Sequence, residues 1–176
     1  TNNAHKLSEL KAAVLNFEIA GLLESEIKEE IPETGTTLKE NALQKARFIY
    51  DKYGYNCFAD DTGLEVNAIN GEPGVFSARY AGPQCSFDDN NAKLLDELKN
   101  EDNRSAQFRT VICLIIDGEE TYFEGVCPGK ILKEYHGEKG FGYDPIFRPN
   151  GFDKSFAEMS MEQKNEISHR GLAVKK

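Results

Sequence analysis

The chain has 176 residues, of which 39% are hydrophobic and 29% are charged, and its formal net charge is -9. This length predicts a single domain over residues 1–176, large enough to bury a core. A charge this negative argues against a nucleic-acid-binding surface, which needs clustered lysine and arginine, but it permits a small anionic substrate. The sequence has no apolar run long enough to span a bilayer and no signal-peptide pattern.

Four cysteines, Cys57, Cys85, Cys113 and Cys127, occur without a C-x-x-C pair. Three of them lie in apolar or strand-like runs. We therefore interpret them as reduced core residues of a cytoplasmic protein and not as a zinc site. Because the sequence starts at Thr1 and not at methionine, we expect the natural protein to be slightly longer.

The first segment predicts a helix over residues 4–15, because Leu7, Leu10 and Val14 recur at helical spacing after small polar residues that suit an N-cap. A helix N-terminus offers free backbone N–H groups and the positive end of a dipole, which suit a phosphate. Lys6 in the first turn opposes that dipole and so favours a polyanion in front of the helix. A capped surface helix with a solvated lysine is the alternative, which this segment alone favours.

Residues 17–31 are acidic and mixed, and they predict one strand and a loop. Thr37 begins a capping-box pattern, and the helix that it opens is expected to end at Gly54. Glu33, just before this helix, is a candidate metal carboxylate, and Lys45 lies along the helix, facing either solvent or a cleft. For each of these two side chains alone, a solvated surface role is the favoured alternative.

Two carboxylates, Asp60 and Asp61, follow an apolar run that predicts a short buried strand at 57–59. Together with Thr62 and Gly63 they predict an acidic turn before a second short strand. Adjacent carboxylates at the end of a strand can bind Mg²⁺ and accept a proton from water. A plain turn is the alternative that this stretch alone favours, since Asp and Gly are common turn residues.

The middle of the chain predicts a helix and several strands. Ser86 caps the helix, and the β-branched run at 108–116 predicts a strand. Residues 117–118 predict a hairpin turn, 121–126 an antiparallel return strand, and 130–135 a further strand. We therefore expect an α/β fold with a mixed central β-sheet flanked by helices.

A glycine-rich segment at 137–147 contains Phe141 and Tyr143, and its glycines let the backbone approach a ligand. Either aromatic ring suits stacking on a flat base. The segment matches neither common phosphate-binding consensus, and a structural loop anchored by buried aromatics is the alternative. The last helix begins at the capping box of Ser160 and carries Lys164.

Two polar neighbours, His169 and Arg170, stand just before a glycine near the end of the sequence. Arginine provides a planar fork for a phosphate or a carbonyl group, and histidine donates from either ring nitrogen. A lone His-Arg pair is usually a surface feature.

These motifs occur in a specific order: T-x-N-x-x-K, E-T-G, E-N-A, A-D-D-T-G-L-E-V, P-G-V-F-S-A-R-Y, G-F-G-Y-D-P-I-F and S-H-R-G. The series resembles the inosine/xanthosine triphosphate pyrophosphatase family over essentially the whole chain. The chain departs from that family's pattern in three ways. The strand that normally precedes the first motif is missing, the C-terminal helix is short, and Thr62 stands where serine is also common.

The resemblance implies hydrolysis of ITP, dITP or XTP between the α and β phosphates, with Mg²⁺ as cofactor. It also implies an elongated homodimer with an active-site cleft between two lobes. Glu33 and Asp61 would bind the metal, Asp61 would also be the base that activates water, and Asp60 would support the turn or the metal ligands. The implied substrate-binding residues are Thr1, Asn2, Asn3, Ala4, His5, Lys6, Lys45, Thr62, Phe141, Gly142, Tyr143, Asp144, Lys164, His169 and Arg170.

Selectivity for the base would follow from whether the group at position 6 of the purine accepts or donates a hydrogen bond. Hypoxanthine and xanthine carry a 6-oxo acceptor, so a donor such as Arg170 or His169 favours them over adenine, which carries a 6-amino donor. Two other functions stay open: a nucleotide sensor that does not hydrolyse, and a related pyrophosphatase for modified pyrimidine nucleotides. The intact carboxylate set argues against the sensor, and the S-H-R-G motif argues against the pyrimidine enzyme.

Overall fold

The structure, a computed structural model, describes residues 3–14, 19–29 and 31–176. Its centre is a five-stranded sheet in the order β2-β1-β3-β4-β5. The strands are β1 (Cys57–Val66), β2 (Pro73–Gly74), β3 (Ser105–Ile116), β4 (Glu119–Ile131) and β5 (Phe147–Pro149). The expected α/β fold is confirmed, with one difference. Every strand pair in the described sheet is antiparallel, whereas we expected a mixed sheet.

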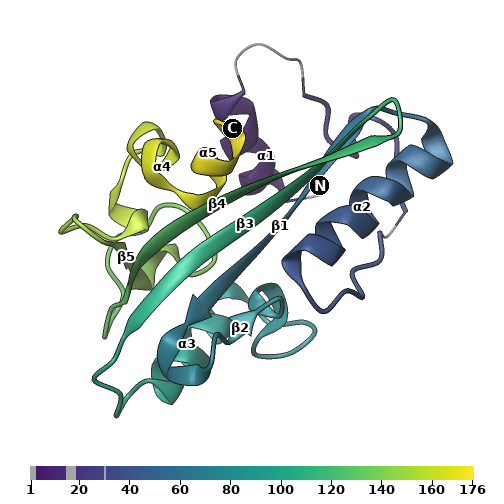
Figure 1. Ribbon diagram of the computed structural model, residues 1–176. Coiled ribbons are helices and arrows are strands. Elements are labelled where there is room, and N and C mark those ends of the chain that lie inside the picture. The colour runs from purple at the N-terminus through teal and green to yellow at the C-terminus, as the bar shows by residue number, and fades with distance from the viewer. Residues whose placement is uncertain (1–2, 15–18, 30) are drawn as a thin grey trace.

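Helices cover both faces of this sheet. They are α1 (Ala4–Ala13), α2 (Leu38–Tyr53), α3 (Phe87–Glu97), α4 (Met161–Ile167) and α5 (His169–Val174). Figure 1 shows α2 on one side of the long β3–β4 ribbon and α1, α4 and α5 grouped on the other. Within the described ranges, no helix is both long and apolar enough to cross a membrane.

Helix α2 forms where its local signals predict. Thr37 accepts a hydrogen bond from the Glu40 backbone in a complete capping box, and Gly54 ends the helix in the left-handed conformation, with φ 70°. Its buried face, with Ala42 and Ala46 fully buried, packs on Val111 and its neighbours of β3. Position and direction of α2 are therefore fixed by capping and by an apolar stripe together.

On the opposite face, α5 lies directly against β4. A Cβ atom added at Gly125 would stand 1.9 Å from the backbone oxygen of His169, so only glycine allows this approach. Further along the same face, Leu64 and Phe108 pack with Leu94 and Leu98 of the α3 region. The core therefore holds α5, which begins at His169, close to the strands.

Two predicted strands differ from the structure. Residues 19–29 and 31 contain a turn and no strand, while 15–18 and 30 lie outside the described residues. The strand predicted at 130–135 is wrong beyond Ile131, because residues 130–131 are the end of a longer β4. Pro128 lies within β4 opposite Gln107, just before the pairing with β5 begins, where its missing N–H is tolerated.

Candidate active site

The acidic pair lies inside a strand. Asp60 and Asp61 pair with Ile112 and Val111 in the uninterrupted antiparallel ladder between β1 and β3. The acidic turn predicted from Asp-Asp-Thr-Gly is therefore wrong, because long-range pairing with β3 overrides the local turn preference. Since successive side chains of a strand point to opposite faces, the two carboxylates lie on opposite sides of the sheet.

Asp60 points toward α1 and α5. Its Oδ2 lies 3.2 Å from Nζ of Lys6 and 3.3 Å from Nη2 of Arg170. Burial alone would raise the pKa of Asp60, but the charges of Lys6 and Arg170 outweigh burial and hold that pKa well below its usual value. Asp60 is therefore a permanent anion that balances two cations.

Asp61 points the other way, toward α2. Its Oδ1 accepts from Nζ of Lys45 at 2.9 Å, and its Oδ2 accepts from Nδ2 of Asn41 at 3.2 Å. The same Lys45 ammonium lies 2.8 Å from Oε1 of Glu33. Burial raises the pKa of Asp61 above its ordinary value, although Lys45 opposes the shift. One cationic centre thus joins both predicted metal carboxylates.

The N-terminus of α1 lies beside this region, but its backbone donors are partly used. The side chain of Asn3 caps the helix and accepts from the backbone N–H groups of His5 and Lys6, which starts the helix at Ala4 as predicted. Lys6 itself reaches Asp60. Thr1 and Asn2, also predicted to bind phosphate, lie outside the described residues.

A series of alternating charges is buried between α1, α4, α5 and β1. Lys164 Nζ lies 2.6 Å from Oε1 of Glu9 and 2.7 Å from Oδ2 of Asp144, and Arg170 Nη1 contacts the other oxygen of Glu9. The residues of this buried charge series, in order, are Asp144, Lys164, Glu9, Arg170, Asp60 and Lys6. Glu9 is its central anion, with 5% of its surface exposed.

The glycine-rich segment at 137–147 lies against this buried charge series. The ring of Phe141 stacks on His5 with centroids 5.3 Å apart, and Nζ of Lys164 lies 5.0 Å from the centre of the same ring. Tyr143 is a core residue instead, because it is buried and its hydroxyl donates to the backbone oxygen of Ser77. Of the two predicted stacking rings, Phe141 is the one near the cations.

His169 and Arg170 are buried and not at the surface. The His169 ring stacks on Phe108 at 4.5 Å, and Nη2 of Arg170 donates to the hydroxyl of Thr62 at 3.2 Å. In the part of the chain that the structure describes, His169 Nδ1 and Arg170 Nε have no hydrogen-bond partner. Buried polar atoms are normally paired, and Asn91 Oδ1 is the third such atom without a partner among the described residues.

The structure therefore brings most predicted site residues together in two groups. Lys45, Glu33 and Asp61 meet on the α2 side of β1. On the other side lie Lys6, Thr62, Phe141, Asp144, Lys164 and Arg170, linked by direct contacts. Gly142 contributes its carbonyl, which accepts from Asn91 at 3.0 Å. Among the described residues, no group of three or more His, Cys, Asp or Glu side chains has the arrangement of a metal site.

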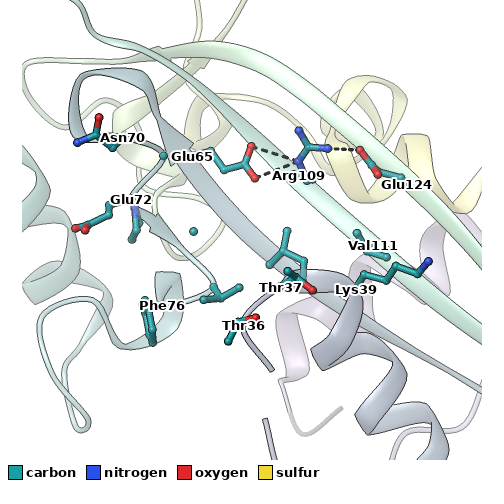
Figure 2. A pocket seen from close by; sticks show the side chains of 15 residues that line it. Thr36, Thr37, Lys39, Glu65, Asn70, Glu72, Phe76, Arg109, Val111 and Glu124 are labelled. Carbon is teal, nitrogen blue, oxygen red and sulfur yellow. Dashed lines mark hydrogen bonds and ion pairs between the residues drawn. The ribbon is translucent and has the colours of Figure 1, made fainter. Parts of the chain in front are cut away.

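A separate surface cavity of about 460 Å³ lies beyond the start of α2. Figure 2 shows Arg109 between Glu65 and Glu124 in its lining, where α2 no longer covers the sheet. None of the predicted site residues lines this cavity. Among its charged side chains, Arg109 pairs with Glu65 and Glu124.

The Ham1 family model matches residues 1–176. The chain belongs to the Ham1 family. The "dITP/XTP pyrophosphatase" of Christiangramia forsetii is 51% identical to it over 176 residues, covering 99% of this chain and 93% of that protein. The protein of the same description from Flavobacterium johnsoniae is 53% identical over 175 residues, with 99% and 91% covered. The solved Staphylococcus aureus Ham1 protein matches with a TM-score of 0.89 and 42% identity, over 99% of this chain and 92% of that one.

The family expected from the order of the motifs is thus confirmed. In this Ham1 protein two buried polar residues beside the predicted site, Glu9 and Asn41, were not predicted from the sequence. Glu9 follows Lys6 by three residues and so shares its helix face, which is a usable signal. Asn41 lies among Leu38 and Ala42 on the apolar face of α2, where a polar residue needs buried partners.

Because the imidazole of His169 is buried, we expect this Ham1 protein to lose stability in mild acid. Burial, together with the charges of Arg170 and Lys164, holds the pKa of His169 well below 6.5. The unfolded chain therefore takes up a proton that the folded protein does not, once the pH falls below the unfolded value. His169 is then expected to lower the free energy of unfolding by up to about 1.4 kcal/mol per pH unit.

Urea unfolding of the wild type and of His169→Gln between about pH 5 and pH 8 measures this effect. The difference in unfolding free energy between the two proteins should stay constant above the unfolded pKa. Below it, the wild type should lose stability faster than the variant. A difference that is constant over the whole range would contradict a neutral, buried His169.

Proposed function

We propose that this Ham1 protein hydrolyses the non-canonical purine nucleotides ITP, dITP and XTP to the nucleoside monophosphate and pyrophosphate. The observation that carries the proposal is the meeting of Asp61, Lys45 and Glu33 on one side of β1, beside the Lys6 end of α1. Relatives about half identical over nearly the whole chain bear the description dITP/XTP pyrophosphatase, which supports the same reaction here.

The proposed reaction adds water across the anhydride between the α and β phosphates. Asp61 accepts a proton from that water, because it is the carboxylate nearest Lys45 and Glu33 on the α2 side of β1. Lys6 and Lys45 offset part of the roughly four negative charges of the triphosphate, which otherwise repel the nucleophile. The pyrophosphate leaves with the electron pair of the broken P–O bond.

Magnesium is the proposed cofactor, and the residues of this chain fit it. Oε1 of Glu33 and Oδ1 of Asp61 both lie close to one positive charge, the Nζ atom of Lys45, at 2.8 and 2.9 Å. Two carboxylates together with phosphate oxygens and water form the ligand set that Mg²⁺ prefers. Glu33 and Asp61 would hold the metal, which would supply positive charge against the phosphates, and Lys45 would add its own charge toward the same anion.

Recognition of the base is proposed for the other side of β1. Arg170 Nε donates and His169 Nδ1 donates or accepts, and both are buried without a partner in the described protein. A 6-oxo purine can accept from such a donor, whereas the 6-amino group of adenine cannot. Phe141 offers its ring for stacking on the base, because Tyr143 is committed to the core.

The proposal extends to the setting of the enzyme. A single pyrophosphatase domain over residues 1–176 would act in the cytoplasm as a homodimer. The four cysteines, all within the described residues, are unpaired, which suits a reducing compartment. Size-exclusion chromatography tests the dimer.

The experiment is an assay of pyrophosphate release from ITP, XTP, GTP and ATP, with Mg²⁺ and with a chelator. We expect fast, metal-dependent release from ITP and XTP and little from ATP and GTP. Orthophosphate as the product would contradict cleavage between the α and β phosphates. Equal rates for all four nucleotides would contradict the proposed recognition of the base, and full activity in the chelator would contradict the magnesium proposal.

A further inference from the structure

We propose that Asn41 is a positioning residue, whose amide holds Asp61 and the Glu33 segment at the separation that a divalent cation needs. The inference rests on the proposed function, because the cation site is part of that proposal. It assigns a task to a residue that makes no contact with the reacting atoms. Asn41 is fully buried in α2, one of the least expected places for an amide.

The two ends of the Asn41 amide bind two different segments. Nδ2 donates to Oδ2 of Asp61 at 3.2 Å, and Oδ1 accepts from the backbone N–H of Gly35 at 2.7 Å. A carboxylate only accepts and a backbone N–H only donates, so the amide has one orientation that satisfies both. Asn41 therefore links β1 to the segment 33–35 and not merely to one of them.

Lys45 makes a second bridge between the same segments, one helical turn further along α2. Its Nζ contacts Oδ1 of Asp61 and Oε1 of Glu33. Asn41 binds only the other oxygen, Oδ2, and thereby turns Oδ1 toward Glu33. The short amide is the fixed bridge, whereas the long lysine side chain is the one that a metal ion can replace.

The segment also passes close to the helix at this point. A Cβ atom added at Gly35 would stand 2.6 Å from Cβ of Glu40 and 2.8 Å from Oδ1 of Asn41. The segment that carries Glu33 is thus held at Gly35 by close contact with α2 as well as by the hydrogen bond. A purely structural Asn41 would make the same bonds, so variants must separate the two roles.

The chain offers a matched control in Gln44. It lies on α2 and binds the same segment, since its Oε1 accepts from the Thr34 backbone at 2.8 Å and its Nε2 donates to the Thr34 hydroxyl at 3.0 Å. Within the described ranges, Gln44 makes no hydrogen bond to Asp61. Gln44→Leu therefore weakens the tether of the segment without touching the orientation of Asp61.

The test measures binding of Mn²⁺ alone to the nucleotide-free protein by electron paramagnetic resonance. We expect Asn41→Leu to bind Mn²⁺ roughly 10–100-fold more weakly than the wild type, as is typical when a partner of a metal ligand is removed. Gln44→Leu should weaken Mn²⁺ binding by much less than Asn41→Leu does, because it loosens the segment but leaves Asp61 oriented. Asn41→Ala, which leaves space instead of an apolar side chain, gives the same readout if the leucine variant does not fold.

Two results would overturn the inference. One is Mn²⁺ affinity close to that of the wild type in a folded Asn41 variant, whatever its melting temperature. The other is an equal loss in Gln44→Leu, which would assign the effect to the tether of the segment. A wild type that binds no Mn²⁺ without nucleotide would overturn the premise of a cation site formed by Glu33 and Asp61 alone, whereas the chelator arm of the pyrophosphate assay tests the magnesium proposal separately.

Discussion

Asp61→Asn is expected to lower kcat for ITP by about 10²–10⁴-fold, the usual contribution of a general base. The amide keeps the shape of the side chain but cannot take a proton from water. The fold is expected to persist, because Lys45 keeps Glu33 as its partner and because burial already disfavours the charge on Asp61. Pyrophosphate release and thermal unfolding of the same preparation measure the two effects.

The neighbouring carboxylate is the matched control. Asp60→Asn changes the next residue of the same strand, but its side chain faces Lys6 and Arg170 in the interior. Its main expected effect is therefore lower stability, because two buried cations lose part of their compensation. An Asp61→Asn enzyme with nearly wild-type turnover would exclude Asp61 as the base.

Glu9→Ala is expected to lower the free energy of unfolding by about 3–5 kcal/mol, the typical loss when one partner of a buried ion pair is removed. Glu9 is the anion shared by Lys164 and Arg170, which are 5% and 2% exposed. Without it, the two cations face each other with only their outer partners left. The melting temperature should fall by roughly 6–20 °C, which calorimetry or urea unfolding detects.

Glu24→Ala serves as the control for this prediction. Glu24 is also paired with a lysine, Lys11, but both side chains are largely exposed. Exposed pairs contribute little, so this variant should unfold as the wild type does. An equally small effect for Glu9→Ala would mean that water, and not Glu9, compensates Lys164 and Arg170.

The parts of the fold that sequence predicts well are those with local signals at both ends. Helix α2 lies between the capping box of Thr37 and the left-handed Gly54. The turn of the β3–β4 hairpin lies at Asp117 and Gly118, which both have positive φ, as such a turn requires. These signals act within a few residues, so they survive in the folded protein.

Strand β1 shows the limit of that reasoning. Asp-Asp-Thr-Gly favours a turn locally, but ten residues of pairing with β3 make it a strand. Within that strand, cations from distant parts of the sequence pair with Asp60 and Asp61. No local pattern contains that information.

Some residues of the candidate site were predicted from the sequence, and others were not. The family motifs named Asp61, Lys45, Lys164 and Arg170, and the structure brings them into two contacting groups. The spacing of Glu9 from Lys6 places it on the same helix face but does not reveal its partners, which lie 155 and 161 positions away. Only the docking of α4 and α5 against α1 creates those contacts.

Because Asp60 and Asp61 point to opposite faces of β1, the positions at which this chain can gain or lose residues in evolution are limited. One inserted residue ahead of them in β1 would send Asp61 toward α5 and Asp60 toward α2, because a one-residue shift exchanges the two faces of a strand. An insertion at the exposed tip of the β3–β4 hairpin would exchange nothing. We therefore expect homologous genes to gain and lose codons at the hairpin tip and to keep the length of β1 constant.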